Sequence, residues 1–491
     1  MLCHLYPKLK DALPVKILRW FLDSVWYPVL IAAIMTLSNV FSLELITFWV
    51  YLGFGFFAAL FCDDMRAIIP IACCGYMTIS GNNNPASNPE GSVFYQPYFY
   101  VQFLFILIVT GILLFGRLAF ELILFPSRRK PFPMLAIGFC ALGVAFMLGG
   151  AFSGYYGLKT AFFGFAEICA LALLYFYFYY TVHWEGIKKG YLASVFLAIG
   201  LGIAVEILYL YVSQGVIING TIHRPLLFTG WGMYNNIGCV MAICVPAPLY
   251  FAATQKHGWI FSILSSVFML AVVLTQSRGS ILFGAATYAL GAVYAVIKSK
   301  GADRWANFSV FAALLVALIV VAIVFKERID ILFGSWPEST LDPNGRLPTY
   351  VEGWNQFKEA PVFGVGFYEC HGFRWGSLSQ DAFLPARYHN TYVQILASCG
   401  AVGIVAYLFH RVQTLLLAFR RPTVEKTFLL LMAFSMILMS LVDCHFFNFG
   451  PGILYAVLLV GAEGADRRDF GPRGKRKTKR KSDISEKISA R

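Results

Sequence analysis

The sequence predicts an all-α polytopic membrane protein with about 12–14 transmembrane helices and one large extracytoplasmic loop that contains short helices. Of the 491 residues, 58% are hydrophobic and only 13% are charged, and the mean hydropathy is +0.67. Soluble domains carry about 25% charged residues. Apolar runs of about 20 residues, long enough to cross a bilayer as a helix, recur throughout the chain. These observations exclude an ordinary soluble domain.

The apolar spans are separated by short polar connections. They fall near residues 25–42, 43–62, 65–80, 98–118, 134–152, 161–181, 191–213, 231–252, 258–275, 279–297, 308–325, 389–410, 427–444 and 450–463. The chain shows no obvious internal repeat, so the inverted-repeat signature of many transporters is not seen. Glu167 and Glu206 lie inside spans, where charge is costly. They could form a proton pathway, but an uncharged or hydrogen-bonded carboxyl between helices is the simpler interpretation.

Lysine and arginine cluster in alternate connections, and this pattern orients the chain. The basic set contains Lys8, Lys10, Lys16 and Arg19; Arg128–Lys130; Lys188 and Lys189; Lys298, Lys300 and Arg304; and Arg411, Arg420, Arg421 and Lys426. Cytoplasmic connections of membrane proteins carry such an excess. We therefore expect a multi-pass plasma-membrane protein with both termini in the cytoplasm.

This orientation divides the chain into five predicted segments. They are a cytoplasmic N-terminal segment (1–24), transmembrane helices with short loops (25–325), a large extracytoplasmic loop (326–388), C-terminal transmembrane helices (389–463) and a basic cytoplasmic tail (464–491). The run Gly474–Lys481 in the tail favours a topology anchor or attraction to anionic membrane lipid. The net charge of +13 therefore does not indicate nucleic-acid binding. The 11 cysteines lie mostly in apolar spans and are expected as small core residues.

The interval from Lys326 to Arg387 is the only long polar interruption, and loops of that length are usually functional. Within it, the pattern predicts a helix that has Asn344 as its N-cap and ends near Glu359. Arg346 would then lie in the first turn, where free backbone N–H groups favour an anion. A structural pairing of this arginine with a loop carboxylate is the alternative.

The residues Tyr388–Tyr392 open the next apolar span. His389 is expected in the first turn of that helix, at the outer boundary between water and lipid. A helix N-terminus disfavours the imidazolium, and a neutral imidazole can accept a proton as a general base must. Asn390 can fix an orientation by hydrogen bonding, and Tyr392 is expected on the same face as His389. Simple packing of a histidine at the membrane interface is the alternative.

Two more arginines are expected on the outer side. Arg278 lies in Thr275–Ser280, which is the whole connection between two spans, so the guanidinium is held at the membrane edge. This favours a lipid-phosphate ligand, with snorkelling to head groups as the alternative. Arg224 precedes Asn235 and Asn236, which begin an otherwise apolar span, and functional and structural roles for it fit the sequence equally.

Other kinds of site fit the loop less well. Glu369, His371, Asp381 and His389 could supply metal ligands, but no pair has a metal-site spacing. A serine hydrolase would need a Gly-x-Ser-x-Gly elbow, which is absent. The turn Gly364–Phe367 is too short a glycine motif to indicate nucleotide binding. We therefore expect neither a metal nor another cofactor.

In the order of these pieces the chain resembles the O-antigen ligase and polymerase superfamily of bacterial membrane glycosyltransferases. The resembling residues are Ser277–Gly279, Gly345, Arg346, Trp354, Pro361, Gly364, Gly366, His389, Asn390, Tyr392, Gly400 and Gly403. The resemblance implies a bacterial inner-membrane enzyme that transfers a glycan from undecaprenyl diphosphate on the outer leaflet to a glycan, lipid or protein acceptor. It also implies that Arg278 and Arg346 hold the diphosphate, and that His389 is essential without a metal.

The expected mechanism is direct displacement at the anomeric carbon, with inversion. His389 would accept the proton of the acceptor hydroxyl, or position that hydroxyl, while Arg278, Arg346 and Arg224 stabilise the leaving diphosphate. Asn390, Tyr392 and Trp354 are expected to support the site.

Ligase-type transfer is the first expectation for this activity. A polymerase of the same superfamily that elongates a surface polysaccharide, and a transporter or flippase for a polyprenyl-linked glycan, are the alternatives. The expected partners are the lipid-linked donor, the acceptor and the surrounding membrane lipids.

Overall fold

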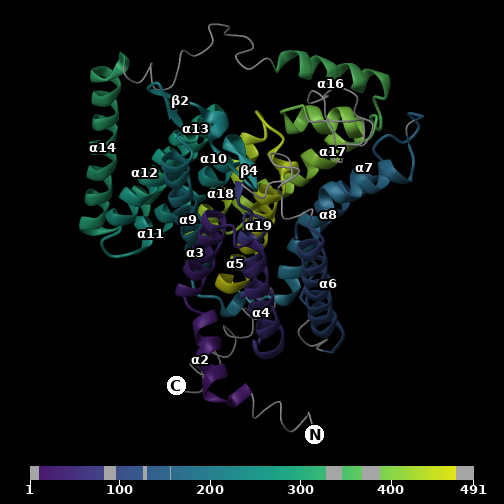
Figure 1. Ribbon diagram of the computed structural model, residues 1–491, viewed down its shortest axis with the longest axis horizontal. Coiled ribbons are helices and arrows are strands. Elements are labelled where there is room, and N and C mark those ends of the chain that lie inside the picture. Colours follow the sequence, from purple (N-terminus) through teal and green to yellow (C-terminus); the bar gives the residue numbers. More distant parts are fainter. Residues whose placement is uncertain are drawn as a thin grey trace, which may run out of the picture.

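The protein is an all-α polytopic membrane protein, as the sequence predicted (Figure 1). The computed structural model describes residues 10–81, 96–124, 130–154, 156–327, 346–367 and 388–470. Its α-helices are α2 (Leu13–Leu22), α3 (Trp26–Phe41), α4 (Glu44–Phe61), α5 (Ile68–Gly75), α6 (Pro97–Ala119), α7 (Ala136–Met147), α8 (Leu158–Thr181), α9 (Tyr191–Ser213), α10 (Tyr234–Cys244), α11 (Pro246–Thr254), α12 (Trp259–Leu274), α13 (Arg278–Lys298), α14 (Gly301–Val324), α16 (Leu347–Glu359), α17 (Thr391–Phe419), α18 (Val424–Met439) and α19 (Phe449–Phe470).

Short elements connect some of these helices. They are a π-turn η3 (Phe120–Leu124), the 3₁₀ turns η5 (Trp184–Gly186), η6 (Arg224–Leu226) and η7 (His445–Phe447), and the strands β1 (Ile217–Ile218), β2 (Thr221–Ile222), β3 (Phe228–Thr229) and β4 (Gly232–Met233). The strands form two antiparallel ribbons, β1–β2 and β3–β4, between α9 and α10. Within the described residues, sheet structure is confined to this connection.

Eight helices of the described residues are long and apolar enough to cross a membrane, or nine if α2 and α3, which meet at 77°, form one span. This number is lower than the predicted one because several predicted spans are short helices flanked by turns. The helices α5, α7, α12 and α18 have 8, 12, 16 and 16 residues. At 1.5 Å per residue, 12 helical residues rise only about 18 Å, well short of the hydrocarbon core.

The centre of the bundle is the stretch formed by α10 and α11, where 89% of the most apolar window is buried. Pro246 separates these two helices because its ring has no backbone N–H to donate. α19 packs against α8 and α18 near this centre. By contrast, only 6% of the corresponding window is buried in α6 and in α14, which stand at opposite edges of the molecule (Figure 1). Their apolar side chains are placed to face lipid.

A break in α17 positions the outer end of the bundle. Gly400 has φ +61° and ψ −154°, a conformation that is open essentially only to glycine. Backbone N–H and C=O groups on both sides of the break lose their helical hydrogen-bond partners. Residues 361–366 supply new partners for them. Four N–H to O bonds do this: Val365 to Ala397 (2.9 Å), Gly366 to Ser398 (2.8 Å), Ala401 to Pro361 (2.9 Å) and Val402 to Val362 (3.1 Å). Irregular backbone at membrane depth requires such internal partners.

The helix predicted within the long loop is present as α16 and ends at Glu359, as predicted. The position of Arg346 was predicted wrongly by one residue: it is the N-cap of α16, and the first turn begins at Leu347. Asn344, the predicted N-cap, lies outside the described residues, as do Glu369, His371 and Asp381 of the metal alternative.

Two charged residues of the spans are now placed. Glu206 on α9 is buried and accepts a hydrogen bond from Asn39 Nδ2 at 3.0 Å, which is the interhelical bond that the sequence favoured over a proton pathway. Arg411 was wrongly predicted in a cytoplasmic connection. It lies inside α17, where Nη2 donates to the Tyr407 hydroxyl at 2.5 Å, because α17 continues to Phe419.

Candidate functional site

The predicted site residues gather around the 440–443 turn, the connection that follows α18. The beginning of α17 is bound to this turn by three hydrogen bonds. Thr391 N–H donates to Ser440 O at 3.0 Å, Asn390 Nδ2 to Leu441 O at 2.7 Å, and Thr391 Oγ1 to Asp443 O at 3.2 Å. Because α17 and α18 are joined in this way, His389 is fixed relative to the turn.

His389 forms a pair with Asp443. Its Nδ1 lies 3.3 Å from Asp443 Oδ1. His389 was predicted wrongly within the first turn of its helix: Asn390 is the N-cap of α17, and its Oδ1 accepts from Tyr392 N–H at 2.9 Å and Val393 N–H at 3.2 Å. His389 precedes the cap with φ +53°, in the left-handed region that few non-glycine residues occupy. Such backbone strain is often found at functional sites.

The Asp443 carboxylate is held by neutral donors as well as by the histidine. Oδ2 accepts from Asn235 Nδ2 at 3.2 Å, and Oδ1 accepts from Cys444 N–H at 2.8 Å. Burial raises the pKa of this carboxyl, but the hydrogen bond with His389 and charge interactions with His445 and Arg346 outweigh burial. The pKa of Asp443 therefore lies well below the usual value, and the group is ionised at neutral pH.

An ionised Asp443 determines which tautomer His389 adopts. A carboxylate only accepts hydrogen bonds, so the neutral imidazole carries its proton on Nδ1 when it bonds to Asp443. The lone pair then lies on Nε2. The pair can accept a proton at Nε2, and the carboxylate can stabilise the imidazolium that results.

Arg346 reaches the same turn from α16. Its Nη1 donates to Val442 O, and its charge acts on the carboxyl of Asp443. One turn along α16, the Tyr350 hydroxyl donates to His389 O at 3.3 Å. The N-terminal part of α16 is thus bound to the backbone of the 440–443 turn and to that of His389. It places a guanidinium close enough to act on the carboxyl of Asp443.

Arg278 and Arg224 approach from other elements. Arg278 is the first residue of α13, and the next residue, Gly279, is so close to the turn that an added Cβ would be 2.4 Å from Val442 Cγ2. Arg224 lies over the ring of Tyr234, 5.1 Å from its centroid, and its charge acts on Arg278. Tyr234 directly precedes Asn235, the residue that binds Asp443. Arg346 therefore contacts the turn directly, Arg278 lies beside a residue that is packed against Val442, and Arg224 is close enough to act on Arg278.

The three supporting residues have different positions. Asn390 caps α17 and binds the turn, as described above. Tyr392 was wrongly expected on the face of His389, since its ring packs inward against Tyr407 with centroids 5.2 Å apart. Trp354 is 51% exposed on α16 and contacts Phe357, so the structure does not bring its ring to the pair.

Residues 260–408 match the O-antigen ligase family. This domain supports a relationship of the chain to the O-antigen ligase superfamily. The match supports a membrane glycosyltransferase of the O-antigen ligase or polymerase type in general. A search of curated proteins found no significant match. The O-antigen ligase domain contains Arg278, Arg346 and His389, whereas Arg224, Asn235 and Asp443 come from outside it.

Asp443 is the site residue that the sequence interpretation missed. It falls within the predicted apolar span 427–444, and carboxylates were considered in that context only at Glu167 and Glu206. The segment Asp443-Cys444-His445 was a usable signal, because a carboxylate and a histidine end an otherwise apolar span there. Its partnership with His389 could not be predicted, since 54 residues separate the two.

Proposed function

We propose that this chain transfers a glycan from undecaprenyl diphosphate, presented in the outer leaflet of the bacterial inner membrane, to a hydroxyl group of an acceptor. The reaction is of the O-antigen ligase type, needs no metal and inverts the anomeric carbon. The observation that carries this proposal is the His389–Asp443 pair, with Arg346 bound to the same turn and Arg278 adjacent to it. The superfamily supports the general reaction and the lipid-linked class of donor.

His389 acts as the general base in this proposal. Nε2 takes the proton of the acceptor hydroxyl while its oxygen attacks the anomeric carbon. The bond between that carbon and the phosphate oxygen breaks, its electron pair leaves with undecaprenyl diphosphate, and the imidazolium is stabilised by Asp443. A positioned general base typically contributes about 10²–10⁴ to the rate.

The arginines act on the leaving group. Negative charge grows on the diphosphate as the glycosidic bond breaks, and guanidinium groups match phosphate oxygens with paired N–H donors. Arg346 and Arg278 approach from α16 and α13, and Arg224 lies next to Arg278. Preorganised charges of this kind are often the largest electrostatic contribution to catalysis.

The orientation in the membrane follows from the charge distribution. Lys130, Lys188, Lys189, Arg420 and Arg421 lie in connections at the opposite ends of the helices from the 440–443 turn. The positive-inside rule places such connections in the cytoplasm. The His389–Asp443 pair then faces the outside, where the lipid-linked donor is exposed.

The test is transfer in vitro with purified protein, an undecaprenyl-diphosphate glycan and a panel of lipid, glycan and protein acceptors. We expect the wild type to form a glycosylated acceptor in the presence of EDTA, and His389→Ala to bind donor but to form no product. Wild-type turnover by His389→Ala, or turnover lost with EDTA and restored by a divalent ion, would contradict the proposal.

The acceptor panel separates the two reactions of the superfamily. A ligase transfers the donor glycan once to a separate acceptor and gives a single product. A polymerase adds repeated units to the donor glycan itself and gives a series of products of increasing length. A transporter would instead move labelled donor across proteoliposomes without forming product. The buried Glu206, on which a transport pathway would depend, is bound to Asn39 within the bundle.

A further inference from the structure

A groove runs between α4 and α6 on the periphery of the bundle. Its upper part is a cavity of about 310 Å³ lined almost entirely by apolar side chains, among them Phe48, Leu52 and Phe103. Its lower part is a cavity of about 560 Å³ at the ends of the same helices. Leu113 lines both cavities, so they are adjacent along α6. From Phe103 to Arg117, α6 rises about 21 Å, which matches the thickness of one leaflet including its head groups, about 20–22 Å.

The lower end of the groove is polar. Lys10, Asp63 and Arg117 line it, together with the open face of Gly116. This end of the groove lies at the C-terminal end of α4, next to Asp63. The N-terminal end of α4, where Glu44 accepts a hydrogen bond from Ser80 N–H at 2.8 Å, lies at the other side of the bundle. The positive-inside rule assigns the polar end of the groove to the cytoplasmic leaflet.

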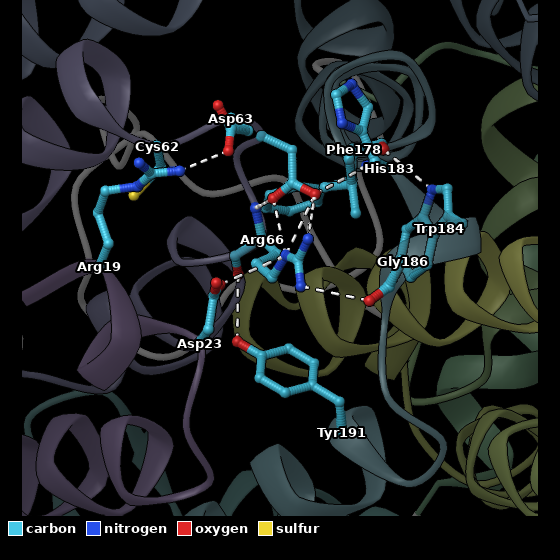
Figure 2. A network of polar contacts seen from close by, with 12 residues as sticks. Arg19, Asp23, Cys62, Asp63, Arg66, Phe178, His183, Trp184, Gly186 and Tyr191 are labelled. Carbon is cyan, nitrogen blue, oxygen red and sulfur yellow. Dashed lines mark hydrogen bonds and ion pairs between the residues drawn. The ribbon is translucent and has the colours of Figure 1, made fainter. Parts of the chain in front are cut away.

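Among the charged side chains that line the lower cavity, two are cations, Lys10 and Arg117, and one is a carboxylate, Asp63. Arg117 donates to Glu121 at 2.8 Å and to Asp63 O at 2.7 Å, while Lys10 donates to Asp63 Oδ1 at 2.8 Å. Asp63 also forms an ion pair with Arg19, in which Nη2 lies 2.5 Å from Asp63 Oδ2 (Figure 2). The hydrogen bond from Lys10 and the charge of Arg19 lower the pKa of Asp63 although burial raises it, so its one negative charge is shared by two cations.

A rigid polar network forms the wall behind this end. Arg66 contacts Asp23 at 3.6 Å, and its backbone oxygen accepts from the Tyr191 hydroxyl at 3.3 Å (Figure 2). The Arg66 guanidinium also contacts the Asp64 carboxylate at 2.9 Å. The network joins the ends of α2, α4 and α9. It fixes the end of α4, and Arg117 of α6 donates to the Asp63 backbone oxygen at 2.7 Å, so a hydrogen bond joins the two walls of the groove at this end.

We propose that this groove binds one anionic glycerophospholipid of the cytoplasmic leaflet, with its phosphate at Lys10 and Arg117 and one acyl chain along α4 and α6. The site is separate from the transfer reaction. Basic pockets between transmembrane helices at the cytoplasmic side match the head groups of such lipids, and the apolar groove matches a chain. A bound lipid would fill the space between α6 and the bundle, because α6 buries little surface against the rest of the protein.

Four glycines provide a matched test by native mass spectrometry of the full-length protein in detergent. Gly116 and Gly55 line the groove, and a Cβ at either position meets no protein atom closer than 3.7 Å. Gly116→Leu and Gly55→Leu therefore place a side chain at the groove on a Cβ that has room, and they improve helix propensity. Gly111 and Gly53 lie on the same helices, have open space around them and do not line the groove. Gly111→Leu and Gly53→Leu are the controls.

The probes are phosphatidylglycerol and phosphatidylethanolamine with identical chains. We expect the wild type and both controls to retain one phosphatidylglycerol molecule in preference to phosphatidylethanolamine. Gly116→Leu should retain less than about a fifth of the phosphatidylglycerol that the wild type retains, because a side chain and an acyl chain cannot share the space. Lys10→Ala should weaken phosphatidylglycerol binding about fivefold, since one basic residue near an anionic lipid contributes about 1 kcal/mol.

Two results would overturn the assignment. One is equal lipid retention by Gly116→Leu and Gly111→Leu, which would show that the groove is not the site. The other is equal binding of the two lipids by the wild type, which would show that the cations do not select the head group.

Discussion

Replacement of Asp443 by asparagine isolates what the carboxylate contributes to His389. The two side chains have the same shape, so the change removes charge and one acceptor and leaves no cavity. In the structure Oδ1 accepts from His389 and Cys444 N–H, and Oδ2 accepts from Asn235. When the oxygen of the new amide in Asp443→Asn occupies the Oδ1 position, it keeps the bonds to His389 and Cys444 N–H. Its NH₂ group then faces the NH₂ group of Asn235, whose amide can rotate to present its oxygen instead.

The size of the effect follows from this geometry. With the oxygen at Oδ1, His389 keeps its tautomer but loses a charged partner for the imidazolium. Hydrogen bonds to charged groups contribute about 1.5–3 kcal/mol, and 1.36 kcal/mol corresponds to a factor of ten in rate. We expect the turnover number of Asp443→Asn to fall about 10- to 150-fold. Affinity for the donor lipid should change little, because the arginines that face the diphosphate are intact.

The assay is single-turnover transfer with saturating donor, and binding of the donor is measured separately. Since the folded pKa of Asp443 is depressed, its contribution to stability is fully present above its unfolded pKa of about 3.9 and is lost only as the pH falls through the lower folded value. Asp443 is therefore ionised throughout the neutral range, and the turnover of the variant is compared with that of the wild type at about pH 7 to 8, where the carboxylate charge is fully present. An unchanged turnover number, or a defect that lies wholly in donor binding, would refute the role assigned to Asp443.

Three further substitutions test the remaining parts of the argument. Arg346→Lys should lose turnover by about 10- to 100-fold, because an ammonium cannot replace the paired donors of the guanidinium; retention of wild-type kinetics would leave Arg346 with only its bond to Val442 O. Glu206→Gln should leave transfer unchanged, since Asn39 can still donate to the side-chain oxygen, whereas abolished activity would favour the transport alternative. Gly364→Ala should lower the free energy of unfolding by about 1–3 kcal/mol, because its φ is +67° and a Cβ would lie 2.4 Å from Ser398 C. Gly154→Ala is the control for thermal unfolding, since Gly154 has φ +79° but no atom within 4 Å of an added Cβ, and equal effects of the two would contradict the steric argument.

The sequence by itself determined the class of fold and indicated several residues of the candidate site. Hydropathy is a property of each segment alone, so apolar runs identified the membrane helices, and local signals such as Pro361 ended α16 at Glu359 as predicted. Arg278, Arg346 and His389 lie in polar segments beside apolar spans. This placement can be read from the sequence alone. Charged groups at a membrane boundary are costly unless they have partners, so a charged residue beside an apolar span indicates a structural or functional partner.

The tertiary structure decided how long the helices are and which residues meet. α7 stops at Met147 and α17 breaks at Gly400, where the segment 361–366 takes over the backbone hydrogen bonds. The same packing joins α17 to the 440–443 turn and pairs His389 with Asp443. These contacts join residues distant in sequence, and their energy depends on the relative positions of whole helices. A periodic or local pattern carries no information about that, so the carboxylate partner of His389 could be found only in the folded chain.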